Sequence, residues 1–130
     1  MTKRETVLFT MAWVALALTG VSILVFGLIA TVWGGASDPP FLRALGVASM
    51  GMGLFGVMIT VIAYRRRERW AWFTLWYYPV FWLTHLLGGL PPGHDHVHQV
   101  VLIVLSLVGL LIPMGAFFRE GRTGERDAPG

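Results

Sequence analysis

The sequence predicts an all-α fold, a four-helix bundle embedded in a membrane. Three observations predict it: the apolar composition, the length of the apolar runs and the placement of the basic residues. The 130-residue chain is 55% hydrophobic and only 13% charged, which is too apolar for a water-soluble domain of this size. A lipid bilayer is therefore the expected solvent and the first expected partner of the chain.

Four apolar runs are long enough to cross a bilayer, because a spanning helix needs about 20 mainly apolar residues. The first run is much longer than the apolar core of a signal peptide, so we interpret it as a permanent helix. Short connections between the runs predict antiparallel neighbours in up-down-up-down order. We expect a single transmembrane domain over residues 1–118, with helices at about 7–33, 41–64, 70–90 and 96–118.

The basic residues define the predicted orientation. Nine of the ten Lys and Arg residues lie at the N-terminus, in the loop 65–69 and in the segment 119–130. Four crossings place these three regions on one side, which is the positive-inside pattern, so both termini are expected in the cytoplasm. We expect 119–130 to be a disordered cytoplasmic tail. The positive charge thus indicates a cell membrane and its anionic lipids, and not nucleic acid.

Small residues recur along the second run at alternating steps of three and four. Because lipid tails are as apolar as leucine, helices in a bilayer associate through close van der Waals contact, which small residues permit. We expect this small-residue seam to be a helix-packing surface and its helix to be the centre of the bundle. The alternative is a groove that holds a lipid or a quinone. The seam consists of Gly46, Ser49, Gly53, Gly56, Thr60 and Ala63.

The third run is rich in aromatic residues and contains a proline. Pro79 has no amide hydrogen, so the Leu75 carbonyl loses its helical partner and we expect a kink there. Pro113 should weaken the end of the fourth helix in the same way. Beyond the kink, one helical face is predicted either to pack against neighbouring helices or to bind a flat apolar ligand such as a quinone. This face carries Tyr78, Phe81, Trp82 and His85.

All four histidines lie at or near the turn between the third and fourth runs. His85 and His98 are expected at matching depths on the two helices, close enough to meet or to hold a haem. Imidazole and carboxylate groups together suit a transition metal. Two other interpretations remain open: Asp95 as the N-cap of the fourth helix, and a turn whose histidines become charged in mildly acidic conditions. The candidate metal ligands are His85, His94, Asp95, His96 and His98.

The layout of the chain resembles that of known membrane proteins. The turn GGLPPGHDHVHQ, followed by the run VVLIVLSLVGLLIP, is similar to small four-helix membrane proteins of high-GC bacteria. More loosely, the four spans with an aromatic third helix resemble the DoxX-type proteins. The resemblance implies a bacterial inner-membrane location and, through the association of DoxX-type proteins with redox complexes, a link to quinones. It is architectural and assigns no functional residue in this chain.

The sequence offers little for catalysis. It contains no cysteine, and no nucleophile with an adjacent base, paired carboxylates or phosphate-binding glycine loop can be recognised. His85 is the one charged or imidazole side chain deep in a predicted span, whereas pumps carry several along their pathway. We expect a non-enzymatic accessory or scaffold component that associates with itself or with a larger membrane complex. The alternative is a metal- or haem-binding redox protein, linked to quinones, that uses the histidine cluster.

Overall fold

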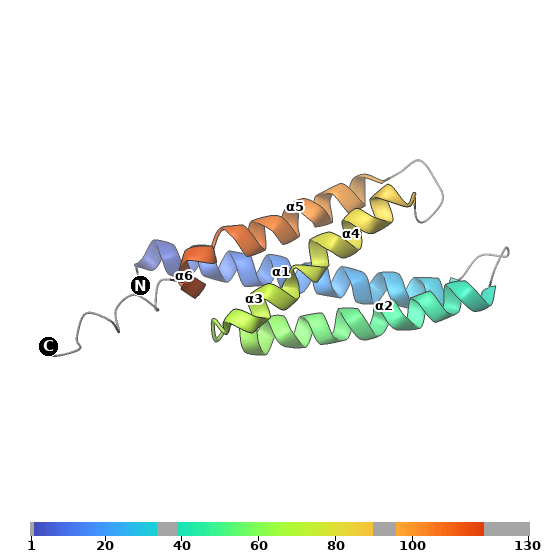
Figure 1. The fold of residues 1–130 in the computed structure, drawn as a ribbon, viewed down its shortest axis with the longest axis horizontal. Helices are drawn as coiled ribbons and strands as arrows, with labels where there is room; N and C mark the ends of the chain where they lie inside the picture. The colour runs from blue at the N-terminus through green and yellow to red at the C-terminus, as the bar shows by residue number, and fades with distance from the viewer. Residues whose placement is uncertain (1, 34–38, 90–95, 119–130) are drawn as a thin grey trace, which may run out of the picture.

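The structure is a computed structural model of the chain, and it describes residues 2–33, 39–89 and 96–118. Within these residues the chain is helical and contains no strand, which confirms the predicted all-α class. The helical segments run back and forth along one long axis (Figure 1). In chain order they are α1 (Lys3–Trp33), α2 (Pro39–Ile59), the π-helix η1 (Thr60–Tyr64), α3 (Arg69–Leu75), α4 (Tyr77–Leu87), α5 (Val97–Leu111) and α6 (Met114–Phe118).

Three helical stretches among the described residues are long and apolar enough to cross a membrane: Lys3–Val32, Pro40–Tyr64 and Val97–Phe118. They correspond to the first, second and fourth predicted spans. α2 begins before the expected position, because a proline in the first helical turn loses no hydrogen bond that the helix would otherwise make. The apolar composition therefore defines a helical protein with at least three helices suited to a bilayer.

The third predicted span is divided. The helix expected over 70–90 is interrupted at Trp76, where α3 ends and α4 begins. The break lies three residues before Pro79, where the missing amide hydrogen leaves the Leu75 carbonyl without its helical partner. The kink predicted at this proline is therefore present, and neither segment alone is long enough to cross a bilayer.

α1 is the central helix of the bundle. It packs most extensively against α2 and also contacts η1 and α5, whereas α2 packs mainly against α1. α2 lies at one edge of the molecule and α5 at the other (Figure 1). The prediction that the second helix forms the centre is therefore wrong. The physical reason is that α1 has two packing faces: Leu24 and Gly27 meet α2, and Ala12 and Leu16 meet Gly109 of α5.

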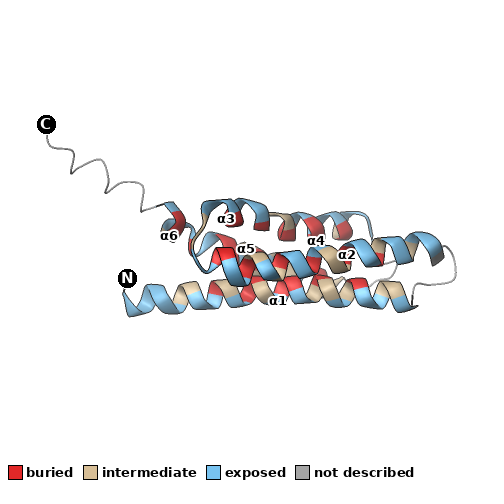
Figure 2. Cartoon of the chain, turned by 90° about the horizontal axis from the view of Figure 1, so that it is seen from below, coloured by how far each residue is buried: buried red, intermediate tan, exposed pale blue. Residues whose placement is uncertain are grey.

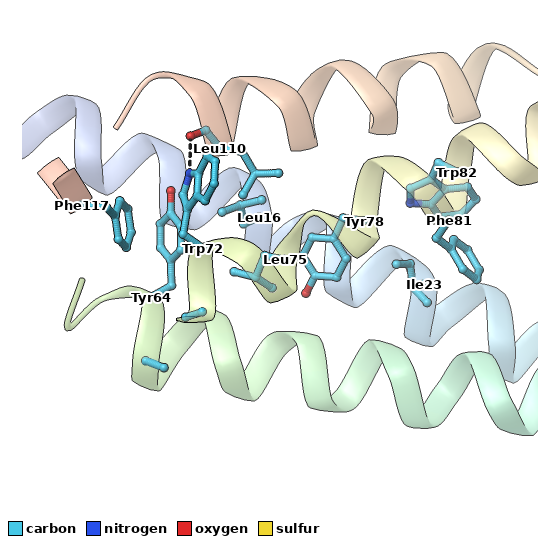
Figure 3. Packing of buried hydrophobic residues seen from close by; sticks show 12 residues of the cluster. Leu16, Ile23, Tyr64, Trp72, Leu75, Tyr78, Phe81, Trp82, Leu110 and Phe117 are labelled. Carbon is cyan, nitrogen blue, oxygen red and sulfur yellow. Dashed lines mark hydrogen bonds between the residues drawn. The ribbon is translucent and has the colours of Figure 1, made fainter. Parts of the chain in front are cut away.

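The inward faces of the helices form a thin core, and the outward faces are exposed and mainly apolar (Figure 2). At the end where α3 begins, two buried side chains close the core by donating hydrogen bonds to α5. The Tyr64 hydroxyl donates to the Gly109 carbonyl, and Trp72 Nε1 donates to the Leu110 carbonyl at 2.9 Å (Figure 3). The Gly109 carbonyl would otherwise pair with residue 113, but Pro113 has no amide hydrogen. Tyr64 therefore satisfies an acceptor that the proline leaves free.

The ends of the fourth pass differ slightly from expectation. Pro113 separates α5 from α6, as predicted. The N-cap of α5 is His96, and no side-chain hydrogen bond caps this helix. The predicted cap, Asp95, and the predicted disordered tail, 119–130, lie outside the described residues.

Candidate functional site

The aromatic face predicted on the third run is assembled on α4 and turned into the bundle. Its four side chains are buried, and α4 packs against α5; three of them are visible in Figure 3. Around His85 the rings are closely packed: the ring centroids of Phe81 and Trp82 lie 4.2 and 6.1 Å from that of His85. Phe26 of α1 packs edge-on against the imidazole, at 5.4 Å. Aromatic contacts therefore hold His85 in one orientation.

Three side chains of this face, Tyr78, Trp82 and His85, present polar atoms that have no hydrogen-bond partner among the described residues. Trp82 Nε1 and His85 Nε2 are both buried and unpartnered among the described residues, and the side chains are 2% and 7% exposed. His85 Nδ1 lies 2.8 Å from the Phe81 carbonyl oxygen. Because a carbonyl can only accept, Nδ1 carries the hydrogen and Nε2 presents a lone pair. A donor and an acceptor thus lie on neighbouring rings of one buried face.

Tyr78, by contrast, fills space between helices. A Cβ added to either Gly20 of α1 or Gly56 of α2 would overlap the Tyr78 hydroxyl oxygen. The phenol therefore occupies a notch formed by two glycines from different helices. At this position the aromatic face is a packing wedge and leaves no room for a ligand.

The predicted metal ligands do not converge within the described part of the chain. His85 is buried, His96 is half-buried and His98 is exposed. The rings of His85 and His98 both pack against Trp82, with centroid distances of 6.1 and 6.4 Å. No group of three or more His, Asp or Glu side chains is placed to hold a metal among the described residues. The other two predicted ligands, His94 and Asp95, lie outside them.

Gln99 takes the inward position at the start of α5 that was expected for His98. Its side chain is fully buried, at 0% exposure, on a helix that packs against α1 and α4. A glutamine at the head of an otherwise apolar run was a signal in the sequence that the prediction missed. Phe26, which closes the ring cluster from α1, had no distinguishing signal.

The small-residue seam is buried along its whole length, at Gly46, Ser49, Gly53 and Gly56 of α2 and at Thr60 and Ala63 of η1. It faces α1 and Tyr78 of the same chain. A Cβ on Gly53 would lie 2.5 Å from the Leu24 amide nitrogen, and one on Gly46 would lie 2.7 Å from the Gly27 carbonyl oxygen. The two backbones are thus as close as the absence of side chains allows. Protein atoms occupy the groove that a lipid or quinone would need.

The opposite side of α2 has no neighbouring helix in the described structure. We call it the outward face of α2, and its large side chains are all exposed, Phe55 to 64%. Gly51 lies among them, and a Cβ added there would meet nothing within 4 Å. At 100° per residue, this face is half a turn away from the seam. It consists of Val47, Gly51, Leu54, Phe55 and Met58, and it continues to Ile62 of η1.

Comparison with models of known protein families, with curated protein sequences and with solved structures finds no match. The class that the fold defines is an all-helical protein with three helices long and apolar enough to cross a membrane. The likeness to DoxX-type proteins stays a prediction. Any more specific function has to be argued from the surfaces described above.

Proposed function

We propose that this protein is a four-pass, non-enzymatic membrane component that associates with a second membrane protein through the outward face of α2. The partner is another copy of the chain or a subunit of a larger complex in the cytoplasmic membrane of a bacterium. The observation that carries the proposal is the division of α2 into two faces. One face packs against α1, and the other exposes large apolar side chains around a glycine.

A crossing by α3 and α4, the third in chain order, is supported by the positions of its neighbours. α2 ends and α5 begins at opposite ends of the bundle (Figure 1), so α3 and α4 must carry the chain from one side to the other if both neighbours span. The 19 residues of Arg69–Leu87 have a helical length of about 28 Å, close to the thickness of a bilayer core.

The charges of the described helices support cytoplasmic termini. The start of α1, which carries Lys3 and Arg4, lies at the same end of the bundle as the turn between η1 and α3, whereas the start of α2, which carries Arg43, lies at the other end (Figure 1). Basic residues are retained on the cytoplasmic side of a bilayer.

The association can be tested with a matched pair of substitutions on one helix. Gly51→Leu fills the glycine position of the outward face, where a larger side chain has room. We expect this variant to fold normally and to lose association, measured as oligomer mass or co-purified protein in nanodiscs. Small interfacial residues allow helices to approach, so a leucine here separates the partners.

Gly53→Leu is the control on the seam, and it should destabilise the fold itself. Wild-type protein that is monomeric in nanodiscs and brings down no partner from its native membrane would contradict the proposal. So would a Gly51→Leu variant that associates as the wild type does.

A second function has one specific observation in its favour, the unpartnered pair of Trp82 and His85. A hydroxyl group has the complementary chemistry, because its oxygen can accept from Trp82 Nε1 and its hydrogen can be donated to His85 Nε2. This chemistry fits a quinol, and it keeps the redox alternative open. The metal form of that alternative would draw its ligands from His85, His94, Asp95, His96 and His98, and the haem form would use His85 and His98.

The binding of a quinol can be distinguished from that of a quinone by measuring the unfolding temperature. A hydroquinone should raise the unfolding temperature of the purified protein, and the corresponding quinone should do so less, because it has no hydrogen for His85 Nε2. His85→Phe should remove the difference, and Leu83→Phe, at an exposed position of α4, should retain it. Equal effects of quinol and quinone would count against this function, and colourless protein without bound metal would count against its haem and metal forms.

A further inference from the structure

The cytoplasmic end of η1 carries a hollow that adjoins the outward face of α2 and shares only Ile62 with it. Its volume is about 390 Å³, and it is lined by Val61, Ile62, Arg65 and Arg66. All four of these residues are exposed, so the hollow opens to the outside of the bundle. The hollow is therefore open to the surrounding lipid and does not lead into the core of the bundle.

The lining has an apolar half and a cationic half. Val61 and Ile62 lie in the last turn of the stretch that is suited to a bilayer, which ends at Tyr64. Arg65 and Arg66 follow four residues later on the same face, directly beyond that boundary. The change from aliphatic to guanidinium side chains thus coincides with the change from acyl chains to headgroups.

Local backbone geometry creates this surface. η1 is a π-helix, and Glu68 N–H donates to the Ala63 carbonyl, five residues earlier, at 3.1 Å. Arg67 then turns the chain with a φ of 60°. The wide turn of η1 and the sharp reversal after it end the helix abruptly and leave Arg65 and Arg66 at the rim of the hollow. π-helical segments are often found at functional positions.

The arginines of the turn differ in their surroundings. Arg67 lies over the ring of Phe9 at 5.1 Å, and Arg69 Nε donates to the Phe117 carbonyl at 3.2 Å. Arg65 packs over the Trp13 ring at 4.9 Å, which fixes its guanidinium beside the hollow. Within the described residues, Arg66 has no hydrogen bond or ion pair. The one acidic residue of the turn, Glu68, accepts from Trp70 Nε1.

We propose that this hollow binds an anionic phospholipid of the cytoplasmic leaflet. Arg65 and Arg66 hold the phosphate, because guanidinium groups donate two parallel hydrogen bonds to phosphate oxygens. Val61 and Ile62 contact the first part of an acyl chain. The two halves of the lining match the two parts of one lipid molecule, and the positive charge selects anionic headgroups over zwitterionic ones.

The experiment uses the full-length protein in detergent, titrated with phosphatidylglycerol or with phosphatidylcholine of the same acyl chains. Bound lipid is counted by native mass spectrometry. We expect phosphatidylglycerol to bind tighter, and each arginine replaced by glutamine to weaken it about fivefold. Arg43→Gln, at the other end of the bundle, should leave the preference unchanged.

Arg65→Gln could also disturb the packing on Trp13. The Arg66→Gln variant then still tests the proposal, because Arg66 makes no hydrogen bond or ion pair within the described chain. Equal binding of the two lipids would overturn the proposal, as would a preference that survives the double variant. Inorganic phosphate should compete only weakly. If phosphate alone displaces the lipid at millimolar concentration, the site is an anion site and the lipid assignment is wrong.

Discussion

Gly53→Ala places a single methyl group against the backbone of α1. The added Cβ would lie 2.5 Å from the Leu24 amide nitrogen and 2.8 Å from the Leu24 Cα. Ordinary van der Waals contact begins at 3.4 Å, so the two helices must separate locally by about 1 Å, and such overpacking costs about 1–3 kcal/mol of the free energy of unfolding. Backbone atoms cannot rotate away as a flexible side chain could.

Gly51→Ala is the matched control, two residues earlier on the same helix. Its Cβ would meet nothing within 4 Å, and alanine favours a helix over glycine by up to about 1 kcal/mol. Both substitutions gain this helix preference, so they should differ by the overpacking cost, about 1–3 kcal/mol, with Gly53→Ala the less stable variant. Unfolding in mixed micelles, followed by circular dichroism, measures this difference. Equal stability of the two variants would refute the assignment of the seam to the contact with α1.

Two further predictions concern the prolines. Tyr64→Phe leaves the buried Gly109 carbonyl without a donor and should lower the free energy of unfolding by about 1–3 kcal/mol. In a Pro113→Ala background this loss should be smaller, because the substituted alanine supplies the helical amide hydrogen. An unchanged loss in this double-mutant cycle would argue against the role of Tyr64. Pro79→Ala supplies the amide that the Leu75 carbonyl lacks, so α3 and α4 should join, and hydrogen exchange should show new protection of the residue 79 amide. Rapid exchange at that position would assign the break to another cause.

The sequence was most informative where one residue dictates the local outcome. Pro79 and Pro113 cannot donate an amide hydrogen, so the helix breaks near both could be predicted without knowledge of the tertiary structure. The apolar runs likewise predicted three of the helices, because length and composition alone define a spanning helix. These features depend on covalent chemistry and on solvent, not on neighbours.

The arrangement around each helix axis was harder to predict. The depths of His85 and His98 follow from counting residues, but which side of α5 turns inward depends on what α1 and α4 present to it. Gln99 is buried there and His98 is exposed. Because most of α5 is apolar on every side, its sequence pattern does not indicate the rotation.

The prediction that the second helix forms the centre of the bundle was wrong for a related reason. The period of the seam shows that α2 has a close-packing face, but one such face requires only one neighbour. α1 has two packing faces, which its nearly uniform apolar composition conceals. Tyr78, placed between Gly20 and Gly56, could be found only once the three helices were assembled.

The most direct test of the proposed four-pass topology is to determine on which side of the membrane each loop lies. The protein contains no cysteine, so single Arg66→Cys and His98→Cys variants can be labelled with a membrane-impermeant maleimide. The account predicts that intact cells label the cysteine at 98, and that the cysteine at 66 reacts only after the membrane is opened. Labelling of both positions from one side, or release of the protein from membranes by alkaline carbonate, would contradict it.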